Sequence, residues 1–130
     1  MRKKILLVDD NNDLLELLRL SFKNAGFSII TATNGLEALK KACSLLPDLV
    51  LLDLMLPELD GFGVCEKLRK NPATASTPIL LLSGMSGQIA RYAGFESGGT
   101  DFVSKPASPS VLIAKIREML AEPKPLQQQQ

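Results

Sequence analysis

Three short, uninterrupted apolar runs stand out along the chain: Ile5–Val8, Leu49–Leu52 and Ile79–Leu82. None of them alternates apolar with polar residues, which is typical of strands that are covered on both faces, as in a parallel sheet. Two weaker runs, Ile29–Ala32 and Asp101–Val103, are further strand candidates. The pattern of apolar positions therefore predicts five short strands.

Helical patterns follow each of these strands. The spacing of apolar residues predicts helices over residues 12–25, 35–44, 62–70, 87–96 and 109–121. Asn11 or Asn12 can cap the first helix and Gly26 can close it, whereas Ser108 and Pro109 begin the last. A strand followed by a helix, repeated five times, predicts a parallel sheet with helices on both faces and right-handed crossovers.

The second and fourth helices carry more specific expectations. In the helix over residues 35–44, we expect Leu36, Leu39, Ala42 and Cys43 to face the core together. The fourth helix contains glycine, and each interior glycine costs about 1 kcal/mol relative to alanine. We therefore expect the fourth helix to be the least stable of the five.

The length and composition indicate one folded domain. The chain has 130 residues, of which 45% are hydrophobic and 22% are charged, so it can bury a single sizeable core. We expect this domain to span residues 1–121. Residues 122–130 have no apolar face and end in four glutamines, so we expect a disordered tail or the beginning of a linker.

Charge and cysteine content argue against several classes of protein. Lys and Arg number 15 against 14 Asp and Glu, and the basic cluster Arg2–Lys4 is interpreted as a solvated leader, so we expect no direct nucleic-acid binding. No apolar run has the ~20 residues that a membrane span needs, and none resembles a signal peptide. Cys43 and Cys65 have no metal-ligand spacing and are interpreted as small core residues, which favours a reduced, cytoplasmic protein.

Histidine is absent from the sequence. Its absence excludes Ser-His-Asp and Cys-His catalysis, histidine-ligated metals and a role as a histidine phosphocarrier. Any chemistry must therefore use carboxylates, hydroxyls and lysines.

Polar residues of this kind follow the predicted strands. Asp9 and Asp10 follow the first strand, Asp53 the third and Ser83 the fourth, and Lys105 comes shortly after the fifth. Because the carboxyl ends of parallel strands meet at one edge of a sheet, we expect these side chains to converge there. Each is an ordinary turn or loop residue when taken alone, and the hypothesis rests on their joint placement.

Clustered carboxylates repel one another, and a hard divalent cation such as Mg²⁺ relieves that repulsion. A nearby lysine and hydroxyl can neutralise and bind a phosphoryl group. Without histidine or an activated cysteine, the candidate nucleophile is a carboxylate. Asp53 is the central candidate because it follows the middle strand.

Four segments carry a resemblance to a known family. They are Val8–Asp10, Asp53–Gly61, Ser83–Gly84 and Phe102–Pro106. In this order and at these strand ends, they resemble the receiver domain of two-component response regulators, over about residues 3–121. The resemblance implies a flavodoxin-like, doubly wound (βα)5 fold with strand order 2-1-3-4-5.

The resemblance also implies roles for metal ligands. Asp10 would bind Mg²⁺ directly, Asp9 largely through water, Asp53 through its carboxylate and Met55 through its backbone carbonyl. Ser83 would hydrogen-bond the phosphoryl group on Asp53 once it arrives.

Lys105 would pair with the same group, and the Lys105–Pro106 bond would be cis. Phe102 would be the aromatic residue that moves inward when Ser83 moves.

The implied function is signalling rather than dedicated enzymatic turnover. A sensor histidine kinase or a histidine phosphotransfer protein would phosphorylate Asp53, and the surface of the fourth helix, fifth strand and fifth helix would change toward an unidentified downstream effector. A homodimer that forms on phosphorylation is a further expectation. Met55 and Met85 replace side chains that could orient water near the site, so we predict slow self-dephosphorylation.

Two alternatives are left open by the residues. An aspartate-nucleophile phosphohydrolase usually has a second acid two residues after the nucleophile, where this chain has Met55. A pseudo-receiver that docks proteins without phosphorylation usually lacks an aspartate or the lysine, and this chain has both.

Overall fold

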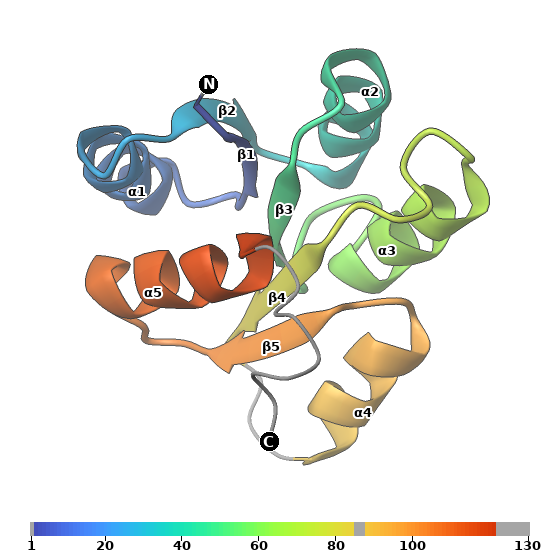
Figure 1. The fold of residues 1–130 in the computed structure, drawn as a ribbon. Coiled ribbons are helices and arrows are strands. Elements are labelled where there is room, and N and C mark those ends of the chain that lie inside the picture. The colour runs from blue at the N-terminus through green and yellow to red at the C-terminus, as the bar shows by residue number, and fades with distance from the viewer. Residues whose placement is uncertain (1, 85–87, 122–130) are drawn as a thin grey trace, which may run out of the picture.

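Five parallel strands form one sheet in the order β2-β1-β3-β4-β5 (Figure 1). The computed structural model describes residues 2–84 and 88–121. The strands are β1 (Lys4–Val8), β2 (Ser28–Ala32), β3 (Leu49–Asp53), β4 (Ile79–Ser83) and β5 (Asp101–Ser104). All four pairings are parallel, so the predicted sheet and its strand order are confirmed.

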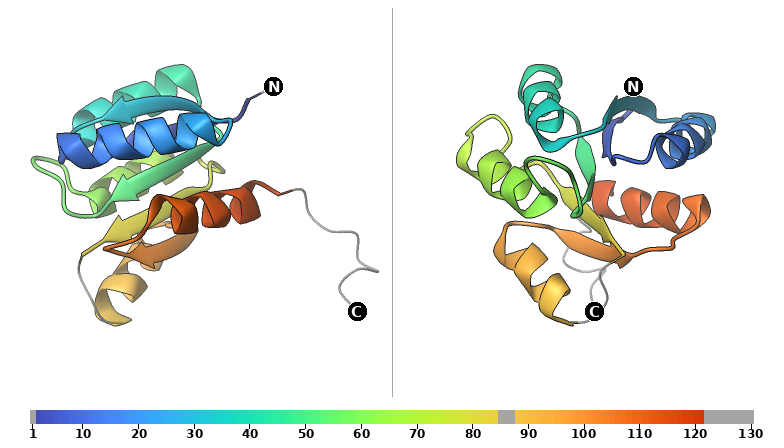
Figure 2. Two further views of the ribbon diagram at one scale, coloured as in Figure 1. Left: turned by 90° about the vertical axis from the view of Figure 1, so that its left-hand side faces the viewer. Right: turned by 180° about the vertical axis from the view of Figure 1, so that it is seen from behind.

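A helix follows each strand, and the helices cover both faces of the sheet. They are α1 (Asn12–Asn24), α2 (Gly35–Leu45), α3 (Gly61–Lys70), α4 (Gln88–Glu96) and α5 (Pro109–Leu120). Helices α1 and α5 lie on one face, and α2, α3 and α4 lie on the other (Figures 1 and 2). The predicted doubly wound architecture is confirmed.

Successive strand residues supply two separate cores. Ile5 and Leu7 pack in the core beneath α1 and α5, whereas Leu6 and Val8 pack in the core beneath α2, α3 and α4. Side chains alternate between the faces of a strand, and both faces are covered here. Both faces therefore need apolar residues, which explains the uninterrupted runs in the sequence.

The capping residues predicted for the first and last helices are confirmed. The Asn11 side chain accepts a hydrogen bond from the Leu14 amide at 3.1 Å, and Gly26 follows α1 with a φ of 101°, a conformation that only glycine adopts without strain. Ser108 Oγ accepts from the Val111 amide at 3.3 Å.

The predicted inner face of α2 is wrong in part. Leu36 is 57% exposed and Cys43 is also exposed, whereas Ala38 and Ala42 are buried. Alanines four residues apart share one face of a helix, and their small side chains allow α2 to pack closely on the sheet. The larger Leu36 is displaced to the surface, and of the two cysteines only Cys65 lies in the core.

No helix in the two described ranges combines the length and apolar character that a membrane crossing requires. The predicted tail over residues 122–130 lies outside the described residues, as do Met85 and residue 87, where the fourth helix was predicted to begin.

Candidate functional site

The carboxyl edge of the sheet gathers the predicted site residues. Asp53 and Ser83 are the last residues of β3 and β4, and Asp9 directly follows β1. Lys105 directly follows β5, and its amide donates to the Ser83 carbonyl at 2.8 Å. The parallel register brings these strand ends to one rim.

Three carboxylates form the centre of the site. Asp9, Asp10 and Asp53 can each direct one oxygen so that all three oxygens lie within 4.8 Å of one another. Asp9 and Asp53 are each only 3% exposed, whereas Asp10 is exposed. Backbone amides hold the buried pair, since Asn11 N donates to Asp9 Oδ1 at 2.9 Å and Met55 N donates to Asp53 Oδ1 at 3.0 Å.

Lys105 joins the two buried carboxylates. Its Nζ lies 2.9 Å from Asp9 Oδ2 and 3.2 Å from Asp53 Oδ2. One ammonium thus bridges residues that lie 96 and 52 positions away in the sequence. The peptide bond between Lys105 and Pro106 is cis, as the resemblance implies.

Burial and neighbouring charges shift the pKa values of Asp53 and Lys105. Burial raises the pKa of Asp53, the Met55 amide opposes this, and the charge of Asp9 raises the pKa further, with Lys105 acting in the opposite direction. Burial alone would lower the pKa of Lys105, but its contacts with Asp9 and Asp53 exceed that effect and raise it. The ammonium is therefore held in its charged form beside a carboxylate that is costly to ionise.

The donor set suits a hard divalent cation. The three clustered ligands are carboxylates, and only one cation, Lys105, contacts them among the described residues. Three carboxylates and one ammonium leave an excess of negative charge at the site. Mg²⁺ prefers oxygen ligands and keeps several waters, and the exposed Asp10 leaves one side of the cluster open to solvent. The residues at this rim therefore fit the predicted metal.

Ser83 and Met55 adjoin the carboxylates, whereas Phe102 lies in the core beneath α4. Ser83 is fully buried, and it follows Leu82, the residue that aligns with Asp53 in the register. Phe102 is 5% exposed, with the Arg91 guanidinium 5.5 Å from its ring centre. Met55 is 58% exposed and lines an open pocket of about 540 Å³ that Asp10 also borders.

Sequence reasoning assigned no role to Gly61. A Cβ at this position would lie 2.5 Å from the Asp53 carbonyl oxygen and 2.6 Å from the Leu54 Cα. Any side chain there would displace the backbone that carries Asp53. The sequence signals that could have indicated this close approach are the position of Gly61 at the end of the Asp53–Gly61 segment and directly after the helix-capping Asp60.

The amino-acid sequence of the chain is similar to proteins of a known family. The family model for the response regulator receiver domain matches residues 5–117. The alkaline phosphatase synthesis transcriptional regulatory protein PhoP of Bacillus subtilis is 42% identical over 120 residues, which is 92% of this chain and 49% of PhoP. The response regulator PleD of Caulobacter vibrioides is 39% identical over 119 residues, 92% of this chain and 26% of PleD. The chain thus spans half or less of these curated relatives.

Solved structures share the same arrangement. The chemotaxis response regulator CheY4 of Vibrio cholerae superposes with a TM-score of 0.88 at 28% identity, over 92% of this chain and all of that chain. The BeF3-activated DrrB receiver domain superposes with a TM-score of 0.82 at 29% identity, over 92% of this chain and 98% of that one.

Proposed function

Because the chain belongs to the response regulator receiver domain family, we propose that Asp53 accepts a phosphoryl group from a phosphohistidine on a partner kinase or phosphotransfer protein. The chain is a receiver domain of two-component signalling. The observation that carries the proposal is the contact of one ammonium, that of Lys105, with Asp53 and Asp9 inside a carboxylate cluster. This arrangement matches what an aspartyl phosphate needs around it.

The transfer step is a displacement at phosphorus. A carboxylate oxygen of Asp53 attacks the phosphorus of the phosphohistidine and forms a P–O bond. The P–N bond breaks, and the imidazole nitrogen leaves with the bonding electron pair and is then protonated from solvent. No residue of this chain has to give or take a proton, which agrees with the absence of histidine.

The metal would supply neutralisation of the phosphoryl oxygens as charge shifts onto them. Asp10, Asp9 and Asp53 would hold it through their carboxylates, with the Met55 backbone carbonyl as a further ligand. The carboxylates are already gathered, so binding would require little rearrangement.

Lys105 would act as a point charge for the incoming group. It already contacts the carboxylate oxygen Asp53 Oδ2 at 3.2 Å, so a phosphoryl group built on Asp53 would lie within its reach. The new group would replace a carboxylate as the partner of the ammonium, which keeps the lysine paired in both states.

The switch would pass through Ser83 and Phe102 to α4. The hydroxyl of Ser83 would donate to a phosphoryl oxygen, and the resulting shift would change the space available to Phe102. Helix α4 would respond because Gly94 packs against Leu81 and Phe102. Differential contacts of this kind bias two pre-existing states and would alter the α4-β5-α5 surface for an effector or a second copy of the chain.

The direct test is incubation with Mg²⁺ and acetyl phosphate followed by intact-mass measurement. We expect the mass of one phosphoryl group to be gained by the wild type and by the surface variant Lys40→Gln, and no gain in Asp53→Asn. EDTA should abolish the gain.

Two other results would favour the alternatives. An unmodified wild type would support an unphosphorylated docking module. Multiple turnover of a small phosphoester without a stable phosphoform would support a phosphohydrolase. Position 55, where such an enzyme usually has a second acid, is Met55 in this chain, which argues against that alternative.

A further inference from the structure

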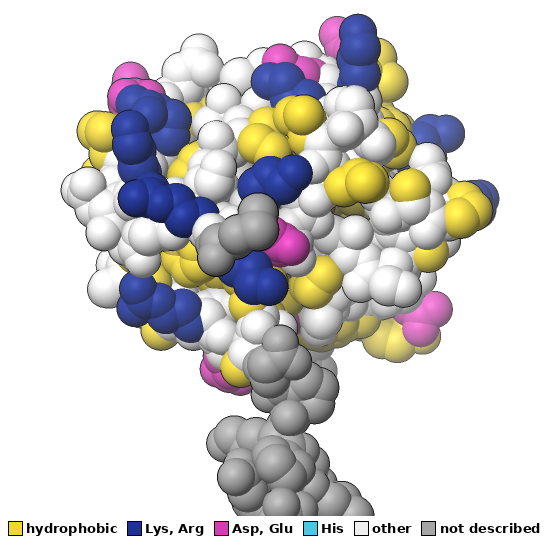
Figure 3. Space-filling view, turned by 45° about the horizontal axis from the view of Figure 1, so that its top comes forward, with side chains coloured by type: hydrophobic (Ala, Val, Ile, Leu, Met, Phe, Trp, Pro, Cys, Tyr) yellow, Lys and Arg dark blue, Asp and Glu magenta, His cyan; other side chains and the backbone are white. Residues whose placement is uncertain are grey.

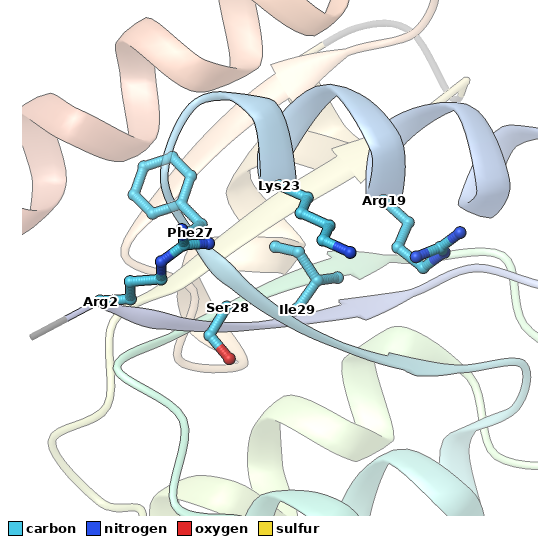
Figure 4. A pocket seen from close by; sticks show the side chains of 6 residues that line it. All are labelled: Arg2, Arg19, Lys23, Phe27, Ser28 and Ile29. Atoms are coloured by element: carbon cyan, nitrogen blue, oxygen red, sulfur yellow. The ribbon is translucent and has the colours of Figure 1, made fainter.

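A basic pocket lies near the amino-terminal ends of β1 and β2, whereas the carboxylates lie at the carboxyl ends of the strands. It has a volume of about 260 Å³ and is lined by Arg2, Arg19, Lys23, Phe27, Ser28 and Ile29. Arg19 and Lys23 extend from α1 toward β2, and Arg2 approaches from the residues before β1 (Figure 4). The three cations thus come from the segment before β1 and from α1, the helix that follows β1.

The pocket carries excess positive charge. Arg19 pairs with Glu16 at 2.7 Å, but within the described ranges neither Arg2 nor Lys23 forms an ion pair. None of the lining residues is acidic.

Further cations surround this edge. Arg117 donates to the Ala25 carbonyl at 3.1 Å, just beyond the end of α1. In Figure 3, Lys and Arg side chains gather on the left of the view, over α1 and α5. An anion that enters the pocket therefore meets a net positive field, which Glu16 reduces in part at Arg19.

The free edge of β2 adds a neutral donor to the cations. β2 is the terminal strand of the sheet, and the Ser28 amide is directed to β1, where it donates to the Lys3 carbonyl at 2.9 Å. Backbone groups alternate in direction along a strand, so the amide of Ile29 faces the free edge. The Ser28 side chain points away from α1 (Figure 4), so the neutral donor on this side is the backbone amide of Ile29.

The pocket is separate from the phosphorylation site. Ser28 aligns with Lys4 at the beginning of β1, whereas Asp9 follows the end of that strand. Five residues at about 3.3 Å each place the two sites on the order of 16 Å apart along the strand direction. A ligand bound here would not compete for the carboxylate cluster.

We propose that this pocket binds a small, free oligophosphate, that is, a ligand with two or more linked phosphoryl groups. The Arg2 guanidinium and the Lys23 ammonium can pair with several phosphate oxygens, and Arg19 can add a further contact that it now shares with Glu16. The pocket is too small for most drug-sized ligands. Phe27 is only 7% exposed, so no aromatic face is offered to a nucleobase. The charge and the volume both favour the phosphate chain itself.

The test is a titration of the ¹⁵N-labelled chain with pyrophosphate and tripolyphosphate, in EDTA and without Mg²⁺, followed by NMR. We expect saturable shifts at the amides of Lys23, Ser28 and Ile29, and weaker binding at higher salt. Lys23→Gln should weaken binding about three- to fivefold. Glu16→Gln, which releases Arg19, should strengthen it about twofold.

Matched controls and competing ligands decide the outcome. Lys40→Gln removes an exposed lysine from α2 and should leave the affinity unchanged. Equal weakening by Lys40→Gln, or no saturable shift at the pocket amides, would overturn the proposal. Tighter binding of a short DNA duplex or of anionic lipid vesicles to the same amides would replace the oligophosphate with that ligand. Phosphorylation of Asp53 is unaffected by any of these results, so the two proposals fail separately.

Discussion

At the scale of single residues, Asp53 is a buried carboxylate whose charged form the proposed phosphoryl transfer requires. Burial and the neighbouring Asp9 raise its pKa, and Lys105 offsets this only in part. Functional sites commonly carry such a conflict at the expense of stability. Removing the charge should therefore stabilise the fold while it removes the proposed nucleophile.

Asp53→Asn should raise the free energy of unfolding by about 1 kcal/mol at neutral pH in EDTA. A pKa that folding raises means that the folded state binds the proton more readily, so the ionised carboxylate costs stability above its folded pKa. That cost fades as the pH falls toward the ordinary value of about 3.9. Chemical denaturation at several pH values measures this, with Glu66→Gln as the surface control. A variant less stable than the wild type at neutral pH would contradict the argument.

A second prediction at the residue scale concerns Met55. Its side chain is 58% exposed beside Asp53, and a thioether is a poor donor and acceptor for orienting water. Met55→Asn should shorten the lifetime of the phosphoform by about three- to tenfold, measured as the decay of the phosphorylated mass. Met55→Leu, which preserves volume and apolar character, should not change it. An unchanged or longer lifetime in Met55→Asn would refute this role.

At the scale of secondary-structure elements, Arg69 joins the end of α3 to two other segments. Its Nε donates to the Gly98 carbonyl at 2.9 Å, and its Nη1 donates to the Thr77 carbonyl at 2.6 Å. Its Nη2 donates to Thr100 Oγ1 at 3.2 Å. This guanidinium therefore holds the loop between α4 and β5 against the loop before β4.

Arg69→Gln should destabilise the fold by about 2 kcal/mol, because several carbonyls lose a charged donor. Arg69→Lys should recover only part of the loss, since an ammonium cannot reproduce the planar fork of donors. Hydrogen exchange at Gly98, Gly99 and Thr100 should accelerate in both variants. Lys70→Gln, an exposed neighbour, is the control; equal effects of Arg69→Gln and this control would show that the contacts contribute nothing specific.

At the scale of the whole molecule, opposite edges of the sheet carry opposite charge. The carboxyl edge gathers Asp9, Asp10 and Asp53, and the amino edge gathers Arg2, Arg19 and Lys23. The near-zero net charge of +1 conceals this separation. Without Mg²⁺, cations and anions should therefore bind at different ends of the domain.

Mg²⁺ should stabilise the domain through the carboxylate edge. At about ten times its Kd, a ligand that binds only the folded state adds about 1.4 kcal/mol, and EDTA should reverse the gain in Tm. Asp10→Asn should lose most of this gain with little change in the metal-free Tm, because Asp10 is exposed. A full gain in Asp10→Asn would show that the cation binds elsewhere.

The sequence was sufficient for the elements and for most of the site. Strands β1, β3 and β4 are buried on both faces, so their apolar runs predicted their bounds to within one residue. Motifs at the strand ends predicted the convergence of Asp9, Asp53 and Lys105, since parallel topology brings those ends to one edge.

Other features were decided by tertiary packing alone. Periodicity placed Leu36 and Cys43 inside, but the close approach of α2 to the sheet selected the alanine face instead. Steric limits at Gly61 arise from the backbone of a different segment. Arg2 was interpreted as a solvated leader, and only the fold brings it beside Arg19 and Lys23 of α1.

The amino-acid sequence by itself determined which segments become strands and helices and which chemical groups end them, because local periodicity and capping act over a few residues. Only the tertiary structure decided which side of each helix is buried, how closely backbones approach the carboxylates, and which distant cations share a pocket. Those features depend on distances between segments of the chain. These distances are set only when all the helices and strands pack around the two cores.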